Sequence, residues 1–334
     1  MSIRSILATS ASALLLAGAA GAQSLSVYCP MSEDDCRSVL AAFEADSGIK
    51  SAFVRLGAGE VLARVRAEAA NPQAGLWLAG TADLFIQAAG EGLLEPHKAA
   101  GIDKVDAKFL SQDDAWTPMA ISPIGFVYNP ERLEELGLEP PTSWEDFAKP
   151  ELKGEVILTH PAASGTASVV LASMVQIYGE DKAFEILKAT DPNVLQYMRS
   201  AGSLTQMVAT GEVAVSQSFT HGLETALANG LPIGVSFPKE GTGYELNSVA
   251  VIANGPEEQR EAARAFLDWV LSDNGQAALG KTYRESVTGY ENPDLQIKTS
   301  DVKLIAYDSE WAGANRARLL QRYEADVRDA SNVK

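Results

Sequence analysis

Short apolar segments alternate with amphipathic segments of helical period along almost the whole chain. This alternation is typical of layered α/β folds, in which helices cover the faces of a sheet. Residues 167–178 and 263–271 each place their apolar side chains on one helical face, which predicts two helices packed against a core. Strands are expected at 25–29, 51–56, 76–79, 155–159, 213–219, 233–237 and 248–253. The sequence therefore predicts an α/β fold.

The first 22 residues have the features of a secretory signal peptide. Arg4 precedes an apolar run at 6–20, and Ala20-Gly21-Ala22 fits a small-x-small cleavage site. Because this run is shorter than the ~20 residues that a membrane-spanning helix needs, a signal peptide is favoured over a membrane anchor. We predict cleavage after Ala22 and a periplasmic protein. The remaining chain of about 310 residues exceeds what one hydrophobic core usually supports, which favours two lobes.

The charge of the chain limits its partners. The formal net charge is −17, and the predicted signal peptide contains a single charged residue, Arg4, so the mature chain has a net charge of −18. Nucleic-acid phosphates and anionic membrane surfaces both attract basic proteins, whereas this chain is strongly acidic. We therefore expect no nucleic-acid partner.

The chain has two cysteines, Cys29 and Cys36, separated by a short loop. In an oxidising compartment, two cysteines this close in sequence predict a disulfide. The alternative is two separate thiols, because Cys36 shares a helical stripe with Val39, Leu40 and Phe43 and would be an ordinary buried residue there. The cysteines and the three histidines of the chain are too scattered to predict a zinc site.

Small and hydroxyl-bearing residues follow several expected strands at the points where helices begin. They occur at 80–83 (Gly-Thr-Ala-Asp), 161–166 (Pro-Ala-Ala-Ser-Gly-Thr) and 200–203 (Ser-Ala-Gly-Ser). Unpaired backbone N–H groups at a helix start favour an anionic group. In open α/β sheets, such loops gather at the carboxyl ends of the strands, where ligands bind. The alternative for any single junction is ordinary N-capping, so the prediction of a shared cleft depends on their number.

Residues 275–282 (GQAALGKT) match the letters of a phosphate-binding loop, G-x-x-x-x-G-K-[ST]. That loop follows a buried strand, whereas here a helical stripe precedes it and the intervening residues favour a helix. The segment is therefore interpreted as a helical turn that ends at Gly280. The sequence also contains no G-x-S-x-G and no H-E-x-x-H motif. An exported enzyme is accordingly the least favoured class.

The order and spacing of these segments resemble those of the periplasmic substrate-binding proteins of ABC importers. The resemblance is to the cluster of ferric-ion, sugar-phosphate and aminoethylphosphonate binding proteins. It covers nearly all of the mature chain, in residues 25–28, 43–49, 62–72, 76–83, 161–166, 211–214, 238–244 and 265–269.

The resemblance implies a two-lobed periplasmic binding protein fold (type II-like), with hinge strands between lobes that close on one ligand. Chain crossings are expected near 124–128 and 244–249. The expected boundaries are 23–120 and 243–285 for lobe 1, and 121–242 and 286–334 for lobe 2. The resemblance further implies a monomer, without catalytic residues or cofactor, that passes a small-molecule solute to a membrane permease.

Two branches of this cluster predict different ligands. Ferric-ion binders hold their metal with two adjacent tyrosines, which align here with His221-Gly222, and this chain contains no adjacent pair of tyrosines. A hard ferric ion prefers phenolate and carboxylate oxygens. Binding of ferric ion or an iron chelate is therefore the alternative function, not the leading one.

The organic-phosphate branch is the more similar one. Its P-x-S-S-G-T loop appears here as residues 161–166 with Ala163 in place of one serine, and its His-Asp pair appears as His221-Gly222. The resemblance implies a small polar solute bearing a phosphate or phosphonate. The two departures from the pattern suggest either a solute that differs from the familiar sugar phosphates or one that is held by fewer polar contacts. Two residues have more than one interpretation. His221 can contact the ligand or only cap a helix, and Trp77 can stack on a ligand or fill the core. The candidate ligand-binding residues are Ser32, Glu33, Thr81, Ser164, Gly165, Thr166, His221 and Glu240.

Overall fold

The computed structural model describes residues 24–199 and 201–328. The predicted signal peptide (1–22) and its cleavage site lie outside these residues. None of the helices within the described ranges combines the length and the apolar composition that crossing a membrane requires.

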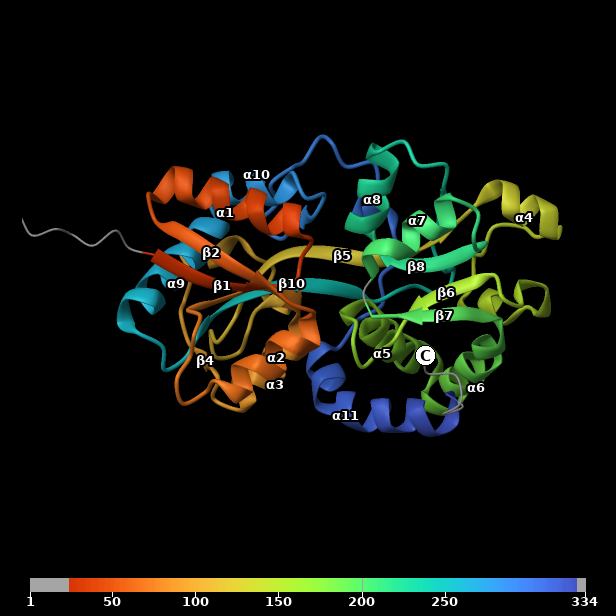
Figure 1. The fold of residues 1–334 in the computed structure, drawn as a ribbon, viewed down its shortest axis with the longest axis horizontal. Helices are drawn as coiled ribbons and strands as arrows, with labels where there is room; N and C mark the ends of the chain where they lie inside the picture. Colours follow the sequence, from red (N-terminus) through yellow and green to blue (C-terminus); the bar gives the residue numbers. More distant parts are fainter. Residues whose placement is uncertain (1–23, 200, 329–334) are drawn as a thin grey trace, which may run out of the picture.

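Two long strands, β5 (Thr117–Tyr128) and β10 (Tyr244–Ile252), run through the centre of the molecule and join its two halves (Figure 1). Residues 117–123 of β5 pair antiparallel with β10, whereas residues 124–128 pair with β8 and β9. The partner of β5 therefore changes between Pro123 and Ile124. This change marks the passage from lobe 1 to lobe 2.

The described strands form a sheet in the order β2-β1-β3-β10-β5-β8-β6-β7. Strand β1 pairs in parallel with β2 and β3 in lobe 1, and β6 pairs in parallel with β7 and β8 in lobe 2. Each predicted strand is present. The remaining strands are β1 (Ser24–Cys29), β2 (Lys50–Arg55), β3 (Leu76–Thr81), β4 (Leu94–Glu95), β6 (Val156–Thr159), β7 (Val194–Met198), β8 (Val215–Phe219), β9 (Gly234–Ser236) and β11 (Glu285–Ser286).

Helices cover both faces of the sheet in each lobe (Figure 1). In lobe 1, α1, α9 and α10 lie on one face and α2 and α3 on the other; in lobe 2, α7 and α8 lie opposite α5 and α6. The two predicted helical stripes lie in α5 and α9, as expected. The helices are α1 (Glu33–Ser47), α2 (Ala58–Ala67), α3 (Ala82–Gly90), α4 (Pro130–Leu136), α5 (Gly165–Tyr178), α6 (Glu180–Thr190), α7 (Leu204–Ala209), α8 (Thr220–Ala228), α9 (Glu257–Val270), α10 (Asp273–Gly280) and α11 (Ser309–Asp326).

Aromatic side chains fill the core of each lobe. Phe43 of α1 packs edge-on against Phe266 of α9, with ring centroids 5.0 Å apart. In lobe 2, Phe126 of β5 contacts Trp144 and Phe147. The segment with phosphate-loop letters forms the helix α10, so its backbone amides are not arranged as a phosphate-binding loop.

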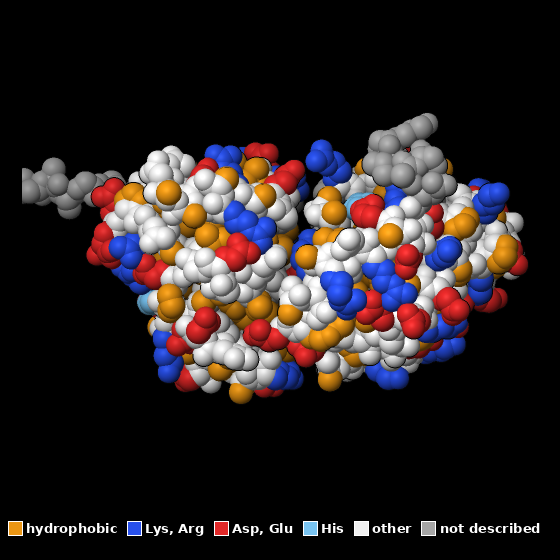
Figure 2. All heavy atoms as spheres, turned by 90° about the horizontal axis from the view of Figure 1, so that it is seen from below, with side chains coloured by type: hydrophobic (Ala, Val, Ile, Leu, Met, Phe, Trp, Pro, Cys, Tyr) orange, Lys and Arg blue, Asp and Glu red, His pale blue; other side chains and the backbone are white. Residues whose placement is uncertain are grey.

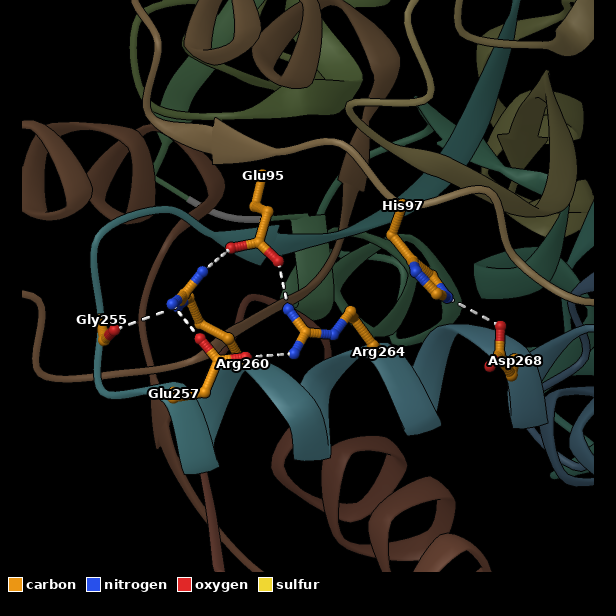
Figure 3. A network of polar contacts seen from close by, with 7 residues as sticks. All are labelled: Glu95, His97, Gly255, Glu257, Arg260, Arg264 and Asp268. Atoms are coloured by element: carbon orange, nitrogen blue, oxygen red, sulfur yellow. Dashed lines mark hydrogen bonds and ion pairs between the residues drawn. The ribbon is translucent and has the colours of Figure 1, made fainter.

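Ion pairs fasten α9 to β4 on the outside of lobe 1 (Figure 3). The carboxylate of Glu95 in β4 accepts hydrogen bonds from both Arg260 and Arg264 of α9, and both arginines also contact Glu257 at the start of that helix. The side chains of the two arginines are about a quarter exposed. The network therefore fixes where α9 lies on the sheet, far from the junction of the lobes.

The chain crosses between the lobes a third time after β11. Glu285 of β11 pairs with Ile121 of β5 in lobe 1. Further along, the backbone N–H of Ile297 donates to the carboxylate of Glu224 in α8, and Leu304 bridges to Thr242. The final helix α11 then packs against α3 of lobe 1 as well as α5 and α6 of lobe 2. We keep the boundaries of the two lobes as a prediction.

The entry to β10 leaves no room for a side chain at Gly243. A Cβ atom there would lie 2.0 Å from Ser173 Oγ and 2.9 Å from the ring of Tyr307. Gly243→Ala should lower the free energy of unfolding by about 1–3 kcal/mol, the usual cost of overpacking. Gly90→Ala is the control, because Gly90 lies in a helix with open space around it and alanine favours helices. Urea denaturation measures both; equal stability of the two variants would contradict the prediction.

Candidate functional site

A cavity of about 400 Å³ lies between the lobes. It is lined by the loop that follows β1, by the ends of β3 and β8, and by the starts of α1, α5 and α8. On the face drawn in Figure 2, a narrow indentation marks the line where the lobes meet. The cavity therefore forms where the carboxyl ends of strands from both lobes face each other, the usual ligand position in open α/β sheets.

Three helices, α3, α5 and α8, begin at the cavity wall. The residues that precede them are Thr81, Ser164 and Phe219, and none of the three makes a side-chain capping bond to its helix. Thr81 and Ser164 are buried, and the Thr81 hydroxyl has no hydrogen-bond partner within the described residues. Ordinary N-capping therefore does not account for these two hydroxyls. Unpaired N–H groups at three helix starts favour an anion in the cavity.

The turn between β3 and α3 has an unusual backbone. Ala79 has a φ of 75° and Gly80 a φ of 137°, so Ala79 adopts a conformation that residues other than glycine seldom adopt. The indole N–H of Trp77 donates to the carbonyl oxygen of Ala79 at 2.9 Å and stabilises this turn. Trp77 is fully buried and packs on Phe85, so it fills the core and does not line the cavity.

The two lobes touch beside the cavity. A Cβ atom on Gly165 of α5 would lie 3.1 Å from Thr81 Cγ2, and one on Gly59 of α2 would lie 3.3 Å from the carbonyl oxygen of Ala162. The lobes are thus closed on each other, and the glycines permit the approach.

Charged and amide side chains form the part of the cavity next to the hinge. Arg284 is 4% exposed and donates to Asp35 at 3.1 Å, which links the segment after α10 to α1. Arg284 Nε, Glu245 Oε2 and Asn247 Oδ1 are buried and have no hydrogen-bond partner within the described residues. Buried polar atoms are normally paired. A ligand in the cavity can pair them.

His221 approaches this group from α8. Its Nδ1 lies 3.1 Å from Ser122 Oγ and 3.8 Å from Glu245 Oε2, and its ring stacks on Phe219. Burial lowers the pKa of His221 well below its usual value, and the nearby charge of Arg284 lowers it further. Burial raises the pKa of Glu245, with Arg284 acting in the opposite direction. The imidazole is therefore neutral at neutral pH and can donate one hydrogen bond and accept another.

The structure brings most of the predicted site residues together. Two do not line the cavity. Glu33 is in the exposed first turn of α1 and pairs with Arg37, and Glu240 accepts a hydrogen bond from Ser143 at 2.7 Å in lobe 2. The residues that line the cavity are Ser32, Thr81, Ser164, Gly165, Thr166 and His221. Of these, Ser32 accepts a hydrogen bond from the N–H of Asp35 and so caps α1.

The predicted disulfide between Cys29 and Cys36 is present, and both cysteines are buried. It closes the turn that carries Ser32 and Asp35 to the cavity wall. A short cross-linked loop has few conformations. The disulfide therefore holds this part of the wall in place.

The sequence prediction missed four charged residues and one amide residue of the cavity. Arg55, Arg199, Arg284, Glu245 and Asn247 all line it but belong to none of the small, hydroxyl-rich junctions. Arg284 follows a helix and Glu245 lies within a crossing strand, so only the fold reveals their location. The described residues contain no group of three or more His, Cys, Asp or Glu side chains placed to hold a metal ion.

Two α/β lobes closed around a polar cavity define a solute-binding protein. A family model described as bacterial extracellular solute-binding protein matches residues 38–294. The chain belongs to this family, which serves ABC importers and implies a periplasmic location. The match confirms the expected class, and the solved structures of similar proteins described next confirm the two-lobed fold.

Similar proteins support the same assignment. A Haemophilus influenzae protein described as uncharacterized is 35% identical over 331 residues, 95% of each chain. The solved structure of the periplasmic binding protein AfuA from Actinobacillus pleuropneumoniae, with exogenous fructose-6-phosphate bound, is 34% identical, with a TM-score of 0.86 over 91% of this chain and 98% of AfuA. A putative 2-aminoethylphosphonate-binding periplasmic protein of Salmonella typhi is 27% identical over 250 residues, 72% of this chain and 70% of that protein. Iron-bound HitA from Pseudomonas aeruginosa shares the fold alone, with 18% identity and a TM-score of 0.78 over 90% of this chain and 98% of HitA.

The depressed pKa of His221 makes stability depend on pH. The unfolded state takes up a proton near pH 6.5, the usual value, whereas folded His221 does so only at lower pH. Stability contributed by neutral His221 is thus present above about pH 6.5 and falls as the pH falls, by at most about 1.4 kcal/mol per pH unit for one proton. His221→Asn should show a shallower decline between about pH 7.5 and about pH 5.5 in urea denaturation. Parallel declines in the two proteins would show that His221 does not titrate in this way.

Proposed function

We propose that this protein captures a small polar solute bearing a phosphate or phosphonate group in the interlobe cavity and delivers it to a membrane permease. The observation that carries the proposal is the meeting of three helix starts, α3 from lobe 1 and α5 and α8 from lobe 2, at one cavity without side-chain caps. Backbone N–H groups and helix dipoles favour a compact anion there. Arg284, which is buried in the same cavity, adds a positive charge.

The rest of the cavity is suited to the other end of such a solute. The unpaired buried atoms Glu245 Oε2, Asn247 Oδ1 and Thr81 Oγ1 can each accept a hydrogen bond. Their partners would be hydroxyl or ammonium groups of the ligand. A volume of about 400 Å³ lies at the small end of ligand cavities. Fructose 6-phosphate and 2-aminoethylphosphonate, named for two similar proteins, both combine an anionic phosphorus group with such donors.

Ferric-ion binding is the alternative and has weaker support in the site. The residues that line the cavity include no tyrosine. Its two acidic residues, Asp35 and Glu245, lie close to Arg284, whose positive charge disfavours binding of a metal ion beside them. Hard ferric ion prefers phenolate and carboxylate ligands. The cavity offers mostly hydroxyls, N–H groups and guanidinium groups.

A thermal-shift screen tests the function. The protein is unfolded and refolded to remove bound ligand, then melted with fructose 6-phosphate, 2-aminoethylphosphonate, inorganic phosphate or ferric citrate. A ligand at about 100 times its dissociation constant stabilises the folded state by about 2.7 kcal/mol and raises the melting midpoint. A rise with ferric citrate alone, and none with any phosphorus compound, would favour the iron alternative.

Two substitutions test the site. Ser164→Ala and Thr166→Ala should each weaken binding of the phosphorus compound that the screen identifies by about tenfold, because a hydrogen bond to a charged group contributes roughly 1.5–3 kcal/mol. The melting midpoint should change little. Ser272→Ala is the matched control: Ser272 caps α10 outside the cavity, so its loss should cost about 1 kcal/mol of stability and leave affinity unchanged. Calorimetric titration and melting curves compare the three; unchanged affinity in both cavity variants would refute the site.

A further inference from the structure

Arg316 is a buried cation behind the cavity wall. It lies in α11, and its residue is 9% exposed. Its Nη1 donates to Ser168 Oγ at 2.6 Å, and its Nη2 donates to the carbonyl oxygen of Pro161 at 3.3 Å. Both partners are uncharged. Burial of a guanidinium group without a paired carboxylate is costly, and no ion pair of Arg316 with an acid occurs within residues 24–199 and 201–328.

The two partners of Arg316 flank the loop that begins α5. Pro161 lies before residues 164–166, which line the cavity, and Ser168 lies after them in the first turn of the helix. One planar guanidinium group thus spans both sides of the turn. Arginine suits this role because its donors form a rigid fork, whereas lysine has one flexible ammonium group.

Helix α11 packs against α3 of lobe 1 and against α5 and α6 of lobe 2, and polar contacts tie it to lobe 2 (Figure 1). Before the helix, Asp308 and Gln176 of α5 exchange two hydrogen bonds of 2.9 and 3.0 Å. Near its end, Glu324 contacts His160 at 3.0 Å. Contacts at both ends of α11 therefore hold the helix from which Arg316 reaches the loop 161–166.

We propose that Arg316 is a positioning residue for the loop 161–166. Its guanidinium ties Pro161 to Ser168, and this bridge keeps the N–H groups at the start of α5 aimed into the cavity. Its positive charge lies behind the same helix start and adds to the attraction for an anion. The effect on binding rests on the proposed function, whereas the effect on the loop does not.

Hydrogen exchange of the ligand-free full-length protein tests the loop directly. The variants are Arg316→Met, Arg316→Lys, Ser168→Ala and the control Arg318→Met. Arg318 is two residues away on the same helix but contacts Glu180 at the surface. In Arg316→Met, amides in the peptide 160–168 should exchange about tenfold faster than in wild type, while the strand 215–219 keeps its rate. Ser168→Ala and Arg316→Lys should give smaller increases, and Arg318→Met none.

Affinity provides the second measurement, with fructose 6-phosphate as the probe. Arg316→Met should weaken binding by about tenfold, and Arg318→Met should bind like wild type. The proposal is overturned if loop exchange is the same in Arg316→Met and Arg318→Met, or if exchange rises equally at 215–219, which would indicate general loosening. Faster loop exchange in a protein that binds no phosphorus compound would support the positioning role and refute the proposed function.

Discussion

The antiparallel pairing of β5 with β10 determines where everything else in the molecule lies. The two strands are paired from Tyr244–Pro123 to Val249–Thr117. Strand β10 also lies beside β3 of lobe 1, and the second half of β5 lies beside β8 of lobe 2. Because α3 follows β3 directly and α8 follows β8, the helix starts at the cavity are placed by this register. The cavity thus depends on backbone hydrogen bonds at the hinge. Contacts between the lobe surfaces, such as that of Thr81 with Gly165, follow from this placement of the lobes.

The cavity is electrostatically different from the protein that surrounds it. The chain has a net charge of −17, yet three arginines and the starts of α3, α5 and α8 line the cavity. At physiological salt, charges on the surface are screened beyond about 8 Å, so the surface acids act weakly inside. Buried groups such as Arg284 act at contact distance in a medium of lower polarity. An acidic surface and a site for an anion are therefore compatible in one molecule.

The sequence predicts the fold well where local patterns determine it. The helical stripes of α5 and α9 and the predicted strands follow from periodicity, and the loop 161–166 was correctly expected at a helix start. Only the family resemblance predicts the central strand β5, as a crossing between the lobes. The strand is buried almost throughout and contains two prolines, so its sequence lacks the alternation of apolar and polar residues by which strands are recognised. Glu240 illustrates the limit at the site: its loop folds against Ser143, a contact between segments that no local pattern relates. Arg284 was missed for the same reason.

The interleaved order of the lobes also affects how the protein is made. Strand β10 lies between β3 and β5, although the whole of lobe 2 up to β9 precedes it in the chain. The sheet of lobe 1 therefore cannot be completed until the ribosome has synthesised residue 252. Pairing between segments so distant in sequence is slow. The first lobe of a nascent chain therefore stays incomplete until late in synthesis, which would suit export in an extended form if residues 1–22 act as the predicted signal peptide.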